Sequence, residues 1–194
     1  MSEILIKNGK VILFKNNDVI LDKKDILIEN DTIIKIENKI DEKDEYYVID
    51  AKNRIIMPGL INTHAHIPMS IFRETTEGYK LYDWLNKVIW PIEDKLTDEE
   101  VYYASMLSFI EMIVTGTTCI NDQYFFSKAA EDTRVRTVLT RTIQDIDGKD
   151  KMNERIKDFI ELYETRNRND SLITYTLAPH ALYTCSGECL SEVA

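Results

Sequence analysis

Two histidines one residue apart, His64 and His66, are the residues of this chain whose types and spacing first suggest chemistry. The chain contains only three histidines, and the third is His180. An apolar run over residues 55–62 precedes the pair and predicts a strand that ends at it. Side chains at positions i and i+2 of a strand share a face, so the two imidazoles could bind one divalent ion. On spacing alone, two ordinary loop histidines are the alternative interpretation.

The elements that must position this pair alternate between strands and helices. Short β-branched runs predict further strands over residues 117–122, 137–143 and 172–178. Helical spacing covers residues 80–95, 97–115, 125–134 and 152–166, and a last helix begins after Ser186. Thr97 and Glu100 have the spacing of a capping box at the start of the second helix. This alternation is typical of parallel βα units, whose barrels carry their active sites at the carboxyl ends of the strands.

The length of the chain limits how much of a barrel it can hold. An eight-unit barrel takes about 250 residues, or roughly 31 per unit, so residues 57–194 supply about four units. We therefore expect an α/β protein with the first half of a TIM-type (β/α)8 barrel in residues 57–194, as the N-terminal portion of a longer protein. Residues 1–56 predict a small antiparallel β lobe, because the turn pairs Asn8-Gly9 and Asn30-Asp31 separate β-branched runs.

The composition excludes several classes of partner. With 24 Lys+Arg against 34 Asp+Glu, the net charge of −10 argues against nucleic acid and anionic membranes, which favour a basic face. No apolar run is long enough to span a membrane, and the start lacks the pattern of a signal peptide. The three cysteines, Cys119, Cys185 and Cys189, are an odd number without a secretory context, so we expect a reduced, cytoplasmic protein.

Residues 57–66, Met-Pro-Gly-Leu-Ile-Asn-Thr-His-Ala-His, resemble the opening strand of the amidohydrolase superfamily, in which His-x-His closely follows Pro-Gly. The stretches over residues 84–93 and 178–186 are similar to the 5′-methylthioadenosine/S-adenosylhomocysteine deaminases and their triazine-hydrolase relatives. The resemblance covers all 194 residues. It implies a metal-dependent (β/α)8 hydrolase barrel preceded by a small β-sandwich lobe. It also implies one divalent metal ion, most simply zinc, with iron, manganese and nickel as alternatives.

The resemblance also assigns roles to individual residues. His64 and His66 match the first two metal ligands of the family. Four residues match positions that contact the substrate: Glu93, Arg141, Arg155 and His180. Glu93 matches a glutamate that contacts the ribose hydroxyls, and the two arginines match substrate-binding arginines. The ordinary structural alternatives are a solvated carboxylate for Glu93, a rim ion pair for Arg141 and a packed side chain for His180.

Two tryptophans near Glu93 suit an aromatic substrate. Trp84 and Trp90 could pack on a purine ring and exclude water from it, although core packing is the expected role for one of the two.

The reaction that the resemblance implies is hydrolytic deamination of 5′-methylthioadenosine, S-adenosylhomocysteine or adenosine to the inosine analogue and ammonia. The partner would be a small nucleoside, and the full-length protein is expected to form a homo-oligomer. The family takes a third histidine ligand, a late aspartate and a glutamate acid/base from positions beyond those matched here. None of them occurs in these 194 residues, so we expect no catalytic acid/base and weak metal binding from this chain alone.

Two other functions compete with this hypothesis. One is a different ring hydrolase, acting on guanine, cytosine, 8-oxoguanine or a triazine. Glu93 and Arg141 discriminate against it, because a free base offers no ribose or tail for them to bind. The other is a non-catalytic scaffold on an amidohydrolase-like barrel, against which the intact His64 and His66 argue.

Overall fold

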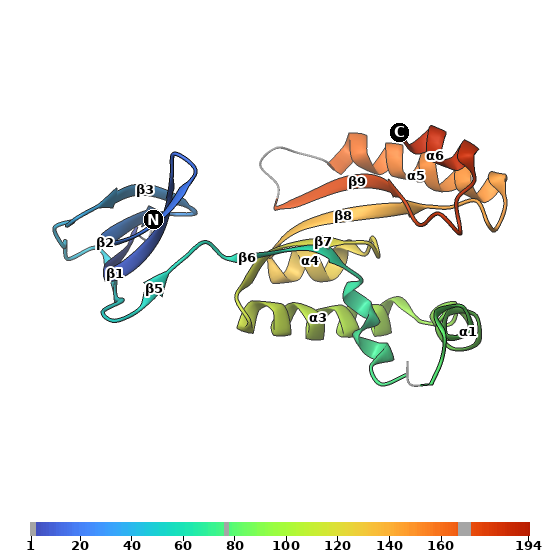
Figure 1. Ribbon diagram of the computed structural model, residues 1–194, viewed down its shortest axis with the longest axis horizontal. Coiled ribbons are helices and arrows are strands. Elements are labelled where there is room, and N and C mark those ends of the chain that lie inside the picture. Colours follow the sequence, from blue (N-terminus) through green and yellow to red (C-terminus); the bar gives the residue numbers. More distant parts are fainter. Residues whose placement is uncertain (1–2, 76–77, 167–171) are drawn as a thin grey trace. The chain divides into compact units, whose positions relative to one another are not determined.

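A computed structural model describes residues 3–75, 78–166 and 172–194. The chain divides into two compact units, Met1–Pro58 and Gly59–Ala194 (Figure 1). Within the described residues, no helix is both long and apolar enough to cross a membrane.

The first unit is a mixed β-sheet in the order β3-β2-β1-β4, with β5 also paired to β1. Its strands are β1 (Glu3–Lys15), β2 (Asp18–Glu29), β3 (Thr32–Glu37), β4 (Tyr47–Asp50) and β5 (Ile55–Ile56). The antiparallel pairing predicted from the hairpin signals is correct for β1–β2 and β2–β3. It is wrong for β4 and β5, which run parallel to β1 because the chain crosses back over residues 38–46 before pairing again. The described residues of this unit form one sheet, so the sandwich stays a prediction.

The turn predicted at Asn8-Gly9 is instead a bulge inside β1. The register with β2 shifts between Ile6 and Gly9, and Asn8 has a φ of 64°. The buried carboxylate of Asp25 accepts a hydrogen bond from the Asn8 backbone N–H at 2.9 Å, which holds the bulge in place. The hairpin turn lies at Asn16 and Asn17, whose φ angles of 51° and 66° suit a tight turn that requires positive φ.

The second unit contains a parallel sheet in the order β6-β7-β8-β9 (Figure 1). Its strands are β6 (Leu60–Ala65), β7 (Thr117–Asp122), β8 (Arg136–Ile143) and β9 (Ile173–Pro179). Its longer helices are α3 (Asp98–Val114), α4 (Ser127–Thr133), α5 (Lys149–Arg166) and α6 (Gly187–Val193). The parallel βα pattern predicted from the sequence is therefore confirmed. Four described strands do not close a barrel, and the complete (β/α)8 barrel stays a prediction.

The apolar run over residues 55–62 is divided between the two units rather than forming one strand. β5 pairs in the first unit, and β6 starts the second, with Pro58 and Gly59 between them. Pro58 has no N–H to continue a ladder, and a Cβ on Gly59 would lie only 2.0 Å from the Thr118 hydroxyl oxygen. Glycine at position 59 therefore lets the chain pass close to β7, and β6 begins at the next residue.

Four short helical segments lie between β6 and α3 in the described part of the chain. A 3₁₀-helix, η1 (Ile67–Phe72), directly follows His66 and was not predicted from the sequence. The helix predicted over residues 80–95 is built from α1 (Leu81–Trp84), a π-helical segment η2 (Leu85–Ile89) and α2 (Trp90–Glu93). Pro91 cannot donate to a carbonyl one turn earlier, which explains why regular α-helical bonding is interrupted just before it.

A capping box confirms the predicted start of α3, and the helix packs on the sheet. The Thr97 hydroxyl accepts a hydrogen bond from the Glu100 N–H, and the Glu100 carboxylate accepts one from the Thr97 N–H at 2.8 Å. Phe109 and Ile120 lie in the main apolar core, which places α3 against β7. Ala65 belongs to the same core, so the residue between His64 and His66 is anchored in it.

Candidate active site

A cleft of about 460 Å³ lies in the second unit, where the strands end. Five of the six site residues predicted from the sequence line it: His66, Glu93, Arg141, Arg155 and His180. His66 directly follows β6, Arg141 is near the end of β8, and His180 directly follows β9. Parallel strands bring these residues together because their carboxyl ends meet at one edge of the sheet.

His64, the sixth predicted residue, lies beside the cleft rather than in its lining. The ring centroids of His64 and His66 are 5.2 Å apart, and the rings meet edge-on. His64 is exposed and His66 is half-buried. Burial, followed by the proximity of His64 and His180, lowers the pKa of His66 below its ordinary value. A lowered pKa keeps the imidazole neutral, which is the form that binds metals.

The backbone around His66 is held from β7. The Gln123 N–H donates to the Ala65 carbonyl at 2.8 Å, and the Ile67 N–H donates to the Asp122 carboxylate at 2.9 Å. Asp122 is 1 % exposed, so this carboxylate is a buried clamp on the residue that follows His66. The clamp was missed from the sequence, although the position of Asp122 at the end of a predicted strand was a usable signal.

The donors present fit part of a metal site. Two imidazoles at one strand end can occupy two ligand positions, whereas a catalytic zinc usually has three protein ligands and a water. Across residues 3–75, 78–166 and 172–194, no group of three or more His, Cys, Asp or Glu side chains could hold an ion. His64 and His66 therefore need at least one further protein ligand.

The buried state of Asp122 predicts a pH effect on stability. Burial raises the pKa of Asp122 from 3.8 to about 6, so the folded state holds its proton more tightly than the unfolded state does. The contribution of this group to the free energy of unfolding therefore falls as the pH rises from about 4 to about 6. In thermal unfolding measurements across this range, the melting temperature of the wild-type protein should decrease relative to that of Asp122→Asn. A constant difference between the two proteins would contradict the prediction.

Glu93 and Tyr124 form a polar pair in the cleft wall. The Tyr124 hydroxyl interacts with the Glu93 carboxylate, and both side chains are half-buried. Burial raises the pKa of Glu93, while the bond from Tyr124 opposes that change. Burial and the charge of Glu93 raise the pKa of Tyr124, so its hydroxyl stays protonated and donates. Tyr124 was missed from the sequence, because only the fold brings it next to Glu93.

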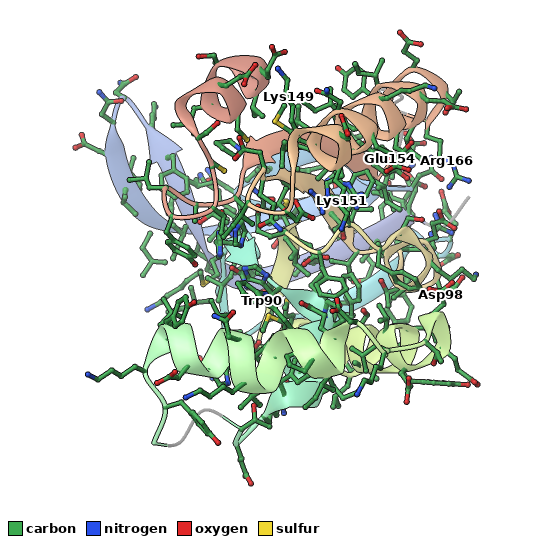
Figure 2. The ribbon with its side chains drawn as sticks, turned by 90° about the vertical axis from the view of Figure 1, so that its right-hand side faces the viewer. Trp90, Asp98, Lys149, Lys151, Glu154 and Arg166 are labelled. Carbon is green, nitrogen blue, oxygen red and sulfur yellow. The ribbon has the colours of Figure 1, made fainter. Side chains whose placement is uncertain are left out.

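Aromatic side chains line the same side of the cleft. Trp84 and Trp90, the latter labelled in Figure 2, both belong to the lining, so neither has only the core role expected for one of them. Among the described residues, the buried indole N–H of Trp84 has no hydrogen-bond partner. The cleft thus offers flat apolar surfaces beside the carboxylate of Glu93.

His180 is anchored in the cleft lining by Thr184. Its Nδ1 lies 2.8 Å from the Thr184 hydroxyl oxygen, and that hydroxyl donates to the Ala181 carbonyl. A Thr184 hydroxyl that donates to Ala181 leaves Nδ1 as the donor to Thr184 and Nε2 with its lone pair. Burial lowers the pKa of His180, which favours this neutral form.

The two arginines of the cleft differ in their partners. Arg155 forms an ion pair with Asp147 through both of its terminal nitrogens. Arg141 lies with its guanidinium carbon 5.4 Å from the centroid of the Phe125 ring. Its buried Nε–H has no hydrogen-bond partner among the described residues. The rim ion pair considered for Arg141 is therefore found at Arg155 instead.

Comparison with known proteins identifies what this arrangement resembles. Residues 55–194 match the amidohydrolase family. A 5′-deoxyadenosine deaminase of Methanococcus maripaludis is 44% identical over 155 residues, which are 77% of this chain and 37% of that protein. A 5-methylthioadenosine/S-adenosylhomocysteine deaminase of Thermoanaerobacter pseudethanolicus is 46% identical over 151 residues, which are 75% of this chain and 35% of that protein. This chain thus spans little more than a third of these curated relatives.

Solved structures resemble the whole of this chain. A zinc-bound adenosine deaminase from Xanthomonas campestris matches with a TM-score of 0.78 and 27% identity, over 99% of this chain and 46% of that one. A triazine hydrolase from Arthrobacter aurescens matches with a TM-score of 0.83 and 20% identity, over 99% of this chain and 50% of that one. At this low identity, the second likeness shows the fold alone.

Proposed function

Since this chain belongs to the amidohydrolase family, we propose that it forms part of a metal-dependent deaminase of adenosine-type nucleosides. The observation that carries the proposal is that one cleft is lined by His66, by the carboxylate of Glu93, by two arginines and by two tryptophans. The substrates we propose are adenosines with a modified 5′ position, which include 5′-methylthioadenosine, S-adenosylhomocysteine and 5′-deoxyadenosine. The names of relatives at about 44% identity support this class.

The domain organisation follows from the same premise. We propose that residues 57–194 are the first four βα units of a barrel that the rest of a longer chain closes. The first unit would then belong to a β lobe beside that barrel. The coverage of about 37% of the relatives supports this arrangement.

His64 and His66 would supply two ligands of one divalent ion, most simply zinc. When bound at such a site, a zinc ion supplies a Lewis acid and an activated water for attack on the amino-bearing carbon of a purine. The buried Asp122 clamp and the core residue Ala65 hold the backbone that carries the two imidazoles at the end of β6.

The other side chains of the cleft would bind and orient the nucleoside. Glu93, held by Tyr124, would accept hydrogen bonds from the ribose hydroxyls. Trp84 and Trp90 would pack on the purine and exclude water. His180 would accept a hydrogen bond from the ligand at Nε2, and Arg141 would bind polar groups at the 5′ end. The acid/base that moves the proton to the leaving ammonia would come from outside these residues.

A substrate panel tests the proposal. The full-length zinc-loaded protein should release ammonia from 5′-deoxyadenosine and 5′-methylthioadenosine, and the adenine absorbance should change to that of hypoxanthine. Guanine, cytosine, 8-oxoguanine and a chlorotriazine serve as the competing substrates. Turnover of one of these without turnover of any adenosine-type nucleoside would overturn the proposal, and no turnover of the whole panel would favour a scaffold.

A further inference from the structure

The relatives act on nucleosides that differ in charge at the 5′ end, and this inference rests on the proposed function. Their names include 5′-deoxyadenosine, 5-methylthioadenosine and S-adenosylhomocysteine. The first ends in a 5′ methyl group and the second in a methylthio group, both uncharged, whereas the third ends in a zwitterionic amino acid that carries a free carboxylate beside its ammonium group. The cations of the cleft should therefore decide how well a carboxylate-bearing tail is bound.

Arg155 already has a carboxylate partner. Its Nη1 donates to Asp147 Oδ1 at 2.9 Å, and its Nη2 donates to Oδ2 of the same carboxylate. Nη1 also donates to the Gln144 carbonyl at 3.2 Å. The side chains of Arg155 and Asp147 are only 22% and 28% exposed, so solvent screens this two-point ion pair incompletely.

The loop that carries Asp147 is anchored on both sides. Gly148 has a φ of 112° and leads directly into α5, on which Arg155 lies two turns further along. Two residues before Asp147, the Asp145 carboxylate accepts hydrogen bonds from the Ser186 N–H and hydroxyl. These bonds connect the loop to the start of α6. Lys151, labelled in Figure 2, also lies 4.0 Å from the Asp147 carboxylate. Asp147 is therefore a fixed neighbour of Arg155.

Arg141 presents the contrasting case. In the part of the chain that the structure describes, no carboxylate forms an ion pair with it, and its Nε–H is unpartnered. Of the two guanidinium groups that line the cleft, one is thus paired with an internal carboxylate. The other has no ion pair among the described residues, and the only carboxylate charge that acts on it there is the more distant one of Asp158.

We propose that Asp147 determines substrate specificity by neutralising Arg155, so that the cleft discriminates against nucleosides whose 5′ substituent ends in a carboxylate. Asp147 does not line the cleft and would act through Arg155. With the pair intact, Arg141 alone is available to the carboxylate of the tail. Without Asp147, two adjacent guanidinium groups would face it, while an uncharged 5′ substituent would be bound as before.

Binding to the full-length, metal-free protein tests this without turnover. Calorimetry should show that Asp147→Asn binds S-adenosylhomocysteine about tenfold more tightly than the wild type, the effect of one charge-assisted hydrogen bond. Its affinity for 5′-deoxyadenosine should stay within about twofold. Asp150→Asn is the matched control, because it removes the same charge from the first turn of α5 and leaves the Asp147–Arg155 pair in place.

A double variant tests whether the freed Arg155 is the cause of the gain in affinity for S-adenosylhomocysteine. Combining Asp147→Asn with Arg155→Gln replaces the ion pair by two neutral amides and should return the affinity for S-adenosylhomocysteine to the wild-type value. Persistence of the gain in the double variant, an equal gain in Asp150→Asn, or no gain in a folded Asp147→Asn protein would each overturn the proposal. If Asp147→Asn loses its thermal transition, Asp147→Ser frees Arg155 in the same way. A wild-type protein that binds no adenosine-type nucleoside would instead contradict the proposed function.

Discussion

Replacement of either His64 or His66 by alanine is expected to abolish deamination by the full-length protein and to reduce its bound zinc well below one equivalent. A catalytic zinc usually has three protein ligands, so the loss of one imidazole leaves too few donors to hold and activate it. Metal analysis of the purified variants and an ammonia-release assay with 5′-deoxyadenosine measure the two effects separately.

The exposed position of His64 separates a loss of metal from a loss of stability. His64 is exposed, so its truncation leaves no cavity in the core, and the melting temperature of the metal-free protein should change little. His180→Ala is the matched control, because it removes the third histidine of this chain, which lines the cleft directly after β9. It should keep the full metal content while weakening nucleoside binding. A full equivalent of metal with unchanged turnover in both His64→Ala and His66→Ala would contradict the assignment.

Truncation of Glu93 is expected to weaken the use of adenosine-type nucleosides far more than that of free adenine. A hydrogen bond from a ribose hydroxyl to a charged acceptor is worth about 1.5–3 kcal/mol, or roughly 10- to 150-fold in kcat/KM. Glu93→Ala also leaves the Tyr124 hydroxyl without its partner, which adds to the loss. The measurement is kcat/KM for 5′-deoxyadenosine and for adenine with the wild type and the variant.

The next residue provides the control for charge. Asp94 is exposed beside Glu93, and Asp94→Ala removes the same charge without altering the cleft lining. This variant should behave as the wild type does towards both ligands. Equal losses for nucleoside and base in Glu93→Ala would show that Glu93 does not bind the ribose.

The strands and the longer helices of the second unit could be predicted because each has its own signal, whereas the 3₁₀-helix η1 has none. The β-branched runs before residues 122 and 143 form β7 and β8, and Thr97 caps α3 as its spacing with Glu100 predicts. Because parallel strands end at one edge of their sheet, the strand pattern also predicts that His66, Arg141 and His180 lie near one another. The hydrophobic periodicity of an element and the end of a strand depend on a few neighbouring residues, so both can be predicted from local sequence.

What could not be predicted depends on residues far apart in the sequence. Asn8-Gly9 suits a turn or a bulge equally well, and the distant carboxylate of Asp25 selects the bulge. Tyr124 gains its role from Glu93 on a separate helix, and Asp122 from the backbone of Ile67. No local pattern encodes these contacts, because they form only when separate elements pack together.

The two sheets differ in strand order, and this implies that they form in different ways while the chain is being synthesised. In the parallel sheet each strand pairs with the next strand along the chain, so it can grow one βα unit at a time as residues leave the ribosome. The other sheet cannot, because the second edge of β1 pairs with β4 and β5, which are made only after β2 and β3. The second edge of β1 therefore stays unpaired until residues 47–56 have been made. An unpaired strand edge can pair with a wrong strand. The cleft lining described here comes together only after β9 is made, since His66 stands before β7 and His180 follows the end of β9.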